Sequence, residues 1–259
     1  LAAASWTPAE IDHLIVASCT GVDCPGLDVR IAESLGMSSY LRRATIVGMG
    51  CQALLPSLYQ AGNTVQVRPE ARVLVLTLEL CTLHFQHGRT LKNMLGSALF
   101  ADGASAVVIG NGNRPGPQLL DSMTFSDYES QDEMAFHPGD TGYQIVLTGK
   151  IPKLVGARIG YLMDRFLGPH GLQVEDINHW VVHPGGMAIL DQVQQQLELP
   201  EPALDHSRAV LRQYGNMSSA TLLFVLQRTI EQSRPVAGDY GILLGFGPGL
   251  TIELGLLRW

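Results

Sequence analysis

Apolar runs and segments of helical spacing alternate along the chain. Short runs rich in valine, isoleucine and leucine predict strands at about 11–17, 44–47, 71–78 and 104–109. Segments with helical spacing follow or separate them, at about 27–35, 51–61 and 94–100. The run at 71–78 is nearly continuous in apolar residues, which is typical of a strand buried on both faces of a sheet. This order of elements predicts an α/β fold.

The second half of the chain repeats the pattern of the first. The run H-L-I-V at 13–16 reappears as H-W-V-V at 179–182. In both halves a glycine, a polar residue and a helical segment then follow. The polar residue of the first half is Cys51, 38 positions after the run begins, and that of the second half is Asn216, 37 positions after its run begins. The apolar run at 240–244 completes the second repeat. Two such repeats predict two similar halves whose sheets lie side by side, with helices between and outside them.

A turn-rich stretch, N-G-N-R-P-G-P at 111–117, separates the two repeats and predicts a linker. We therefore place an N-terminal half at 1–114 and a C-terminal half at 115–259. The chain begins L-A-A-A-S-W without an initiator methionine, and we expect the N-terminal half to have a further region upstream.

Cys51 lies where the first repeat turns from strand to helix. Gly48 and Gly50 allow backbone conformations and close approaches that a side chain would forbid. We expect Cys51 among the first residues of the helix, where the positive end of the helix dipole favours a thiolate and lowers the cysteine pKa. The alternative is a buried structural cysteine, since free cysteines are among the most buried residues.

Two further residues are expected at the same edge of the sheets. His183 directly follows the strand at 179–182, and Asn216 is the counterpart of Cys51. Cysteine and histidine form an activated nucleophile, and histidine with an asparagine amide forms an oxyanion hole that stabilises an enolate. These residue types fit acyl transfer to sulfur followed by carbon–carbon bond formation. The structural alternatives are a strand-capping His183 and a helix-capping Asn216.

The composition narrows the class of protein. With 46% hydrophobic and 16% charged residues, the chain has the composition of a soluble globular enzyme. Its net charge of −7 argues against a nucleic-acid partner, and no apolar run reaches the roughly 20 residues of a membrane helix. The four cysteines form neither a disulfide framework nor a zinc pattern, so we expect no metal and a cytoplasmic location; they are Cys19, Cys24, Cys51 and Cys81.

Several motifs closely resemble those of type III polyketide synthases, such as chalcone synthase and its bacterial relatives. They are G-M-G-C at 48–51, L-F-A-D-G-A at 99–104, H-P-G-G at 183–186, Y-G-N-M-S-S-A at 214–220 and G-F-G-P-G at 245–249. The segment S-C-T-G-V-D-C-P-G at 18–26 is similar to another family motif. The resemblance implies a thiolase-like fold in an αβαβα arrangement, a homodimer, and no permanently bound cofactor. Coenzyme A thioesters would be the substrates.

Carried over by this resemblance, Cys51 receives a starter acyl group from acyl-CoA. His183 and Asn216 hold the thioester carbonyl of malonyl-CoA during decarboxylation, and His183 keeps Cys51 as a thiolate. Phe100 matches a gatekeeper between tunnel and cavity, and Cys24 matches a residue that reaches the partner's cavity. The resemblance also assigns substrate contacts to Cys19, Thr20, His84, Ile145, Ser218, Phe246 and Gly247, and a coenzyme A tunnel to Gly186 and Ala188.

The departures from the plant pattern bear on the substrate. Cys19 and His84 stand where plant enzymes carry threonine, and Ile145 stands where they carry a phenylalanine that contacts the starter. Ala101 replaces the usual glycine of L-F-G-D-G. Loss of the aromatic wall at 145 favours an aliphatic starter and a pyrone- or resorcinol-type product.

Other interpretations use the same fold or the same residues. They are a ketoacyl-carrier-protein synthase III, a ketosynthase that condenses once on coenzyme A or carrier-protein thioesters, and a non-catalytic dimer partner. The first usually has G-N-T-S in place of G-N-M-S and lacks G-F-G-P-G. A cysteine protease does not suit the doubled β/α pattern.

Overall fold

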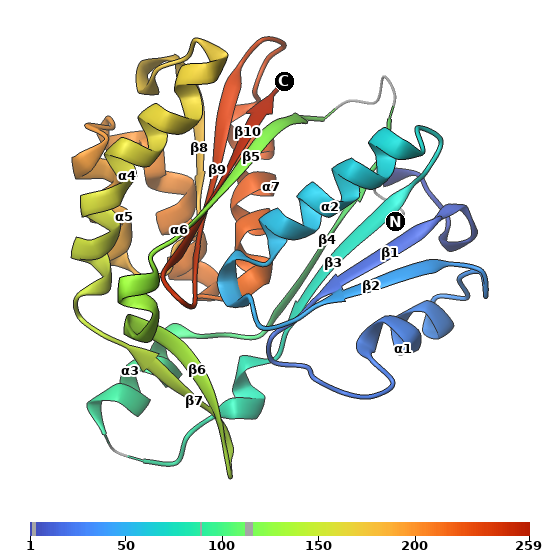
Figure 1. The fold of residues 1–259 in the computed structure, drawn as a ribbon, viewed down its shortest axis with the longest axis horizontal. Helices are drawn as coiled ribbons and strands as arrows, with labels where there is room; N and C mark the ends of the chain where they lie inside the picture. Colours follow the sequence, from blue (N-terminus) through green and yellow to red (C-terminus); the bar gives the residue numbers. More distant parts are fainter. Residues whose placement is uncertain (2–3, 89, 112–115) are drawn as a thin grey trace.

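The computed structural model describes residues 1, 4–88, 90–111 and 116–259. Two mixed β-sheets lie side by side, with helices between them and on both outer faces (Figure 1). This α/β/α/β/α arrangement confirms the predicted fold class. The predicted linker at 111–117 lies largely outside the described residues.

The first sheet has the strand order β2-β1-β3-β4. β1 pairs in parallel with both β2 and β3, and β3 pairs antiparallel with β4. The bounds are β1 His13–Ala17, β2 Arg42–Ile46, β3 Val73–Glu79 and β4 Gly103–Ile109. β1 is buried along its whole length, as its apolar sequence predicts, whereas β2 is an exposed edge strand.

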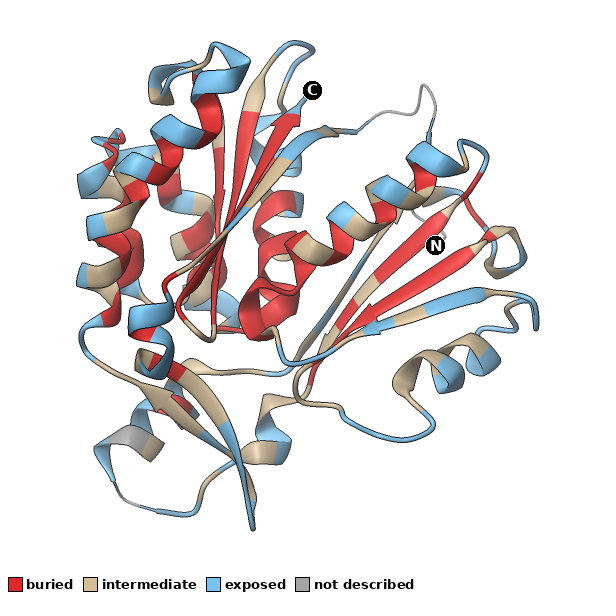
Figure 2. Ribbon diagram, viewed as in Figure 1, coloured by how far each residue is buried: buried red, intermediate tan, exposed pale blue. Residues whose placement is uncertain are grey.

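The second sheet has the strand order β5-β10-β9-β8. β8 and β9 are parallel, and β10 is antiparallel to both β9 and β5. The bounds are β5 Gln118–Ser126, β8 Ile177–Val182, β9 Tyr240–Gly247 and β10 Thr251–Arg258. β9 and β10 are almost wholly buried because helices cover both faces of this sheet (Figure 2).

The middle layer contains the most buried helices. α2 (Leu54–Val67) and α7 (Thr221–Ser233) lie between the sheets, with α6 (Asp205–Tyr214) beside α7. Leu54 and Leu222, both without exposed surface, share one apolar cluster with Val75 of β3 and Leu243 of β9. Outside, α1 (Leu27–Ser34) covers the first sheet, and α4 (Ile151–Leu167) and α5 (Met187–Gln196) cover the second.

The two predicted repeats share part of their topology. β1 and β8 correspond, as do α2 and α7, and β3 and β9: β1 pairs in parallel with β3 as β8 does with β9, although β1 is an inner strand and β8 an edge strand. Before the first turn into the middle layer the chain forms β2, but before the second it forms α6. The repeat is therefore confirmed at the turns and in the parallel strand pairs β1–β3 and β8–β9.

A smaller lobe lies at the end of the sheets where these turns occur (Figure 1). It contains the short helix η4 (Cys81–His84), helix α3 (Leu91–Leu99) and a separate hairpin of β6 (Met134–Gly139) and β7 (Gly142–Leu147). β7 contacts both η4 and α3. Within the described part of the chain, no helix combines the length and the apolar character needed to cross a membrane.

Candidate active site

Cys51 lies on a tight turn between β2 and α2. The turn η3 (Gly50–Gln52) is 3-10 helical, and α2 begins only at Leu54. Gly50 has φ +60°, and a Cβ atom there would lie 2.5 Å from Cδ of Pro248, so the turn requires glycine. Cys51 itself is 6% exposed. The turn therefore holds the thiol in the interior, close to the loop that contains Pro248.

Asn216 lies on the equivalent turn of the second half, before η9 (Ser218–Ala220) and α7. Its backbone N–H donates to the carbonyl of Leu99 at 2.8 Å, and its carbonyl accepts from the N–H of Ala101 at 2.9 Å. These two bonds form a parallel bridge with Phe100. The Ser218 N–H donates to Asn216 Oδ1 at 2.8 Å, which directs the amide NH₂ group the other way.

The structure brings Cys51 and Asn216 together. Cys51 Sγ lies 3.9 Å from Asn216 Oδ1, although the two residues are 165 positions apart. His183 follows β8 as predicted and is 1% exposed, and its backbone N–H donates to the carbonyl of Leu244 at 2.7 Å. Neither ring nitrogen of His183 has a hydrogen-bond partner among the described residues. A buried imidazole without partners is costly and is typical of a group that acts on a ligand.

Burial keeps both the thiol and the imidazole neutral. It raises the pKa of Cys51 to about 11, with a smaller contribution from the negative charge of Glu79. It also lowers the pKa of His183 to about 4. The expectation that the helix start lowers the Cys51 pKa is therefore wrong for this structure. Cys51 precedes α2 instead of lying in its first turn, and the loss of hydration outweighs the helix dipole.

Glu79 is the main functional candidate that the sequence did not reveal. It ends β3 with no exposed surface and accepts hydrogen bonds from the Cys19 N–H at 3.2 Å and from the Thr20 N–H at 3.2 Å and hydroxyl at 2.6 Å. The hydroxyls of Ser218 and Ser219 donate to its other oxygen. Its charge acts to raise the pKa of Cys51. The sequence did contain a signal for Glu79: it is a carboxylate directly after the predicted buried strand, at the sheet edge predicted for Cys51.

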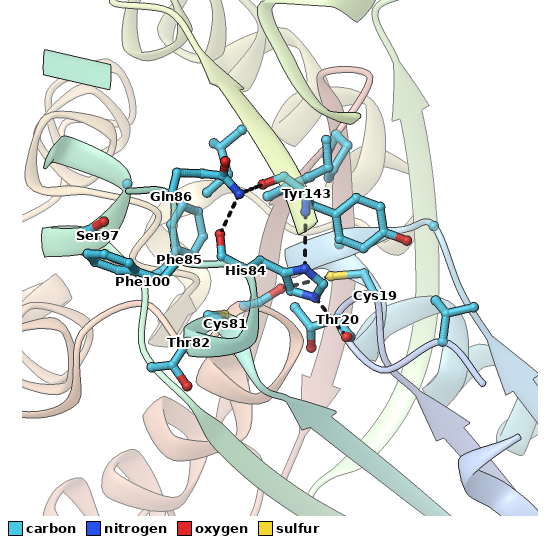
Figure 3. A pocket seen from close by; sticks show the side chains of 18 of the residues that line it. Cys19, Thr20, Cys81, Thr82, His84, Phe85, Gln86, Ser97, Phe100 and Tyr143 are labelled. Atoms are coloured by element: carbon cyan, nitrogen blue, oxygen red, sulfur yellow. Dashed lines mark hydrogen bonds between the residues drawn. The ribbon is translucent and has the colours of Figure 1, made fainter. Parts of the chain in front are cut away.

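A cavity of about 400 Å³ lies beside the two turns (Figure 3). Six residues predicted to contact substrate line it, namely Cys19, Thr20, His84, Phe100, Ile145 and Ser218. Gly50 and Pro248 form part of the wall next to Cys51, and Phe136 of β6 faces Phe100 with ring centroids 6.1 Å apart. Cys51, His183 and Asn216 are buried and are not among the residues that line this cavity.

The other residues predicted to bind substrate lie elsewhere. Phe246 is 1% exposed and belongs to the core of the second half, and Gly247 packs against Gln52. Of the G-F-G-P-G loop, Pro248 lines the cavity. Cys24 and Ala188 are exposed, Gly186 is half-buried, and none of the three lines the cavity. Among the residues that the structure places, no three His, Cys, Asp or Glu side chains form a group suited to a metal ion.

Comparison with known proteins places this geometry in a family. The C-terminal domain model of the chalcone and stilbene synthases matches residues 123–259, and the N-terminal domain model matches residues 3–113. The chain belongs to the chalcone and stilbene synthase family. It is a type III polyketide synthase of the bacterial kind, an acyltransferase that forms carbon–carbon bonds, and its fold is thiolase-like.

Individual relatives span the chain almost completely. A 1,3,6,8-tetrahydroxynaphthalene synthase of Streptomyces peucetius subsp. caesius is 37% identical over all of this chain and 70% of its own length. A 3,5-dihydroxyphenylacetyl-CoA synthase of Amycolatopsis balhimycina is 35% identical over all of this chain and 71% of its own length. The C-terminal type III polyketide synthase domain of Steely1 from Dictyostelium superimposes with a TM-score of 0.90 at 28% identity, over 98% of this polyketide synthase and 72% of that chain.

Proposed function

We propose that this polyketide synthase loads a starter acyl group from acyl-CoA onto Cys51 and extends it with malonyl-CoA. In the loading step the thiol attacks the thioester carbonyl, His183 takes the thiol proton, and coenzyme A leaves. This route suits the structure because the His183 ring nitrogens have no partner among the described residues and both groups begin neutral.

In the extension step, His183 and Asn216 hold the thioester carbonyl of malonyl-CoA. Loss of carbon dioxide leaves an enolate whose oxygen is stabilised by the Asn216 NH₂ group and by His183. The enolate carbon attacks the Cys51 thioester, and the Cys51 thiolate leaves, so the chain gains two carbons. The observation that carries this proposal is the Cys51–Asn216 contact; a buried His183, whose ring nitrogens have no partner among the described residues, supports it.

We propose an aliphatic starter and a pyrone- or resorcinol-type product. The support comes from the wall around the cavity, where Ile145, Phe100 and Phe136 present apolar surface. The names of the two bacterial relatives indicate different products, so they support the reaction class only.

We also propose a homodimer. Apolar side chains that are more than half exposed gather on η4, α3 and the segment between them, namely Leu83, Phe85, Leu91, Met94 and Leu95. Burial of such a patch stabilises an association between copies. Sedimentation velocity would show a dimer, and a monomer at high concentration would contradict the proposal.

The free thiols of all four cysteines support a reducing, cytoplasmic location.

The function is tested by incubating the enzyme with malonyl-CoA and a panel of acyl-CoA starters of graded length. We expect an acyl adduct on Cys51 by intact-protein mass spectrometry and a pyrone or related polyketide by product analysis. Cys51→Ala should abolish both, and Cys51→Ser should retain at most slow loading because serine is a poorer nucleophile. Product formation by Cys51→Ala would contradict the mechanism. A product extended only once would indicate a single-condensation ketosynthase instead.

A further inference from the structure

The β6–β7 hairpin forms one wall of the cavity but belongs to neither main sheet. Its strands pair only with each other in the described sheets, and Phe136, Tyr143 and Ile145 line the cavity from it. At its base, the N–H of Gly249 donates to the carbonyl of Met134 at 2.9 Å. Its tip, at residues 139–142, lies far from this anchor along both strands. Other contacts must therefore position the tip.

Gln86 provides several of these contacts at once. Its amide Nε2 donates to the carbonyls of His84 at 3.1 Å, Thr141 at 3.1 Å and Tyr143 at 3.3 Å, with one hydrogen shared. Its Oε1 accepts from the Thr141 hydroxyl at 3.0 Å. Figure 3 shows this side chain bridging the segment after η4 and the start of β7. Every polar group of the Gln86 side chain is thus used within the protein.

His84 joins the same strand to the loop after β1. The Tyr143 N–H donates to His84 Nδ1 at 3.2 Å, so the ring hydrogen lies on Nε2, which donates to the Thr20 carbonyl at 2.9 Å (Figure 3). The rings of His84 and Tyr143 lie with centroids 4.7 Å apart. A Cβ atom on Gly142 would lie 3.0 Å from His84 Nδ1, and Gly142 has φ +104°, so the approach requires glycine there.

We propose that Gln86 and His84 form a clasp that holds the hairpin tip against the cavity and thereby sets the length of acyl chain that the cavity accepts. Both are positioning residues: they act through the backbone of Thr141 and Tyr143, which places the Ile145 side chain. The ring nitrogens of His84 are occupied by the backbone, so the ring serves as a spacer in the wall and not as an acid or base. The link to chain length rests on the proposed polyketide extension.

The test compares two Gln→Leu variants in the same lobe. Gln86→Leu removes all bonds of the Gln86 amide, whereas Gln144→Leu changes an exposed side chain on β7 for which no hydrogen bond occurs in the described structure. Hydrogen–deuterium exchange would follow the backbone amides at 134–147. Steady-state kinetics would give kcat/KM for short and long acyl-CoA starters, and product analysis would give the number of extensions.

We expect faster hairpin exchange in Gln86→Leu and a change of about tenfold in the ratio of kcat/KM for long over short starters, since contacts with a few methylene groups set selectivity on this scale. Gln144→Leu should match the wild type in both. His84→Phe, which keeps a ring but loses both hydrogen bonds, should shift exchange and selectivity in the same direction as Gln86→Leu.

If a folded Gln86→Leu variant shows the same hairpin exchange and the same starter selectivity as the wild type, the proposed clasp is wrong. If that variant does not fold, Thr141→Val decides, because it removes only the hydroxyl bond to Gln86 and should accelerate exchange to a smaller degree; unchanged exchange would overturn the proposal. The exchange measurement needs no turnover. Absence of an acyl adduct on wild-type Cys51 would therefore refute the proposed function, while the exchange data would still decide whether the clasp exists.

Discussion

The two turns that lead into α2 and α7 have similar backbone conformations, but Asn216 and Cys51 on them differ in their hydrogen bonds. Each has a glycine with positive φ, a 3-10 turn and a buried helix. On the second turn, Asn216 makes three short hydrogen bonds and is tied to Phe100. On the first, the Cys51 thiol has weaker side-chain interactions, with Asn216 Oδ1 at 3.9 Å and with Ser218. A group that stabilises developing charge benefits from being fixed in advance, whereas a nucleophile must keep its reactive atom free.

A buried glutamate lies close to each turn, and the two glutamates differ in how many hydrogen bonds they accept. Glu79 lies against the Asn216 turn and accepts hydrogen bonds from backbone and hydroxyl donors on both oxygens. Glu253 of β10 pairs with Gly245, whose neighbours include Gln52 of the Cys51 turn. Among the described residues, Glu253 accepts one side-chain bond, from Thr124, and its Oε1 has no partner; burial raises the pKa of Glu253 to about 7. Donors make a buried charge tolerable, and without them the carboxyl group takes up a proton more readily.

The largest expected effect comes from removing the fixed donor. Asn216→Ala should slow the decarboxylation of malonyl-CoA by about 10² to 10³. Loading of Cys51 should fall much less, because in the proposed mechanism His183, and not Asn216, accepts the thiol proton. The two steps are measured separately, decarboxylation by carbon dioxide release and loading by intact-protein mass spectrometry.

Asn216→Asp is the matched control for this prediction. Aspartate can still accept from the Ser218 N–H and so preserves the turn, but it has no NH₂ donor. We expect it to be as slow in decarboxylation as the alanine variant. Equal losses of loading and decarboxylation in both variants would show that Asn216 has a general structural role.

Replacing the well-paired glutamate should affect stability. In Glu79→Gln the amide oxygen can still accept from the N–H groups of Cys19 and Thr20, but the NH₂ group replaces the acceptor of the Ser218 and Ser219 hydroxyls. We expect the free energy of unfolding to fall by about 2 to 4 kcal/mol, measured by urea denaturation. Glu133→Gln is the control, because Glu133 pairs with the exposed Lys150 and its loss should cost much less than the loss of Glu79. Similar losses in both variants would contradict the role of the buried network.

The positions of the two turns were predictable, because each leaves a local trace. A glycine before a polar residue and a helical segment, at the same distance from a similar strand, located both Cys51 and Asn216. Likewise His183 directly follows an apolar strand, and the order of strands and helices gave the α/β class. These features depend on neighbouring residues along the chain, which sequence patterns record.

The properties that depend on distant residues were not predictable. The Cys51 pKa is set by burial under both halves and by Glu79, and only the folded chain brings these together. Phe246 and Pro248 belong to one motif, yet the pleat of β9 turns Phe246 into the core, and only Pro248 reaches the cavity. These bonds of His84 and Gln86 end on backbone atoms, in the hairpin and in the segments of Thr20 and His84, and backbone atoms carry no residue-specific signal.

The neutral state of the nucleophile can be tested through its pH dependence. Because the pKa of Cys51 is raised to about 11, the thiolate fraction below that pH rises with pH. Alkylation of the free enzyme by iodoacetamide should therefore accelerate about tenfold per pH unit between about pH 7 and 10. Parallel labelling of Cys51→Ala corrects for the other thiols. A rate that is already constant at neutral pH would instead indicate a thiolate paired with a protonated His183.

The smallest expected effect concerns Glu253, the glutamate with one partner. Its folded pKa of about 7 lies above the ordinary value of 4.5, so the folded state holds the proton more tightly than the unfolded state. The unfolded chain loses that proton first as pH rises, and the stability of the wild type should decline across this window. Glu253→Gln keeps an acceptor for Thr124 and carries no charge. At pH 8 it should raise the melting temperature by about 2 to 4 °C, equivalent to about 1 kcal/mol, and below pH 4.5 it should give no gain. A gain of equal size at both pH values would show that packing, and not the buried charge, limits stability beneath the Cys51 turn.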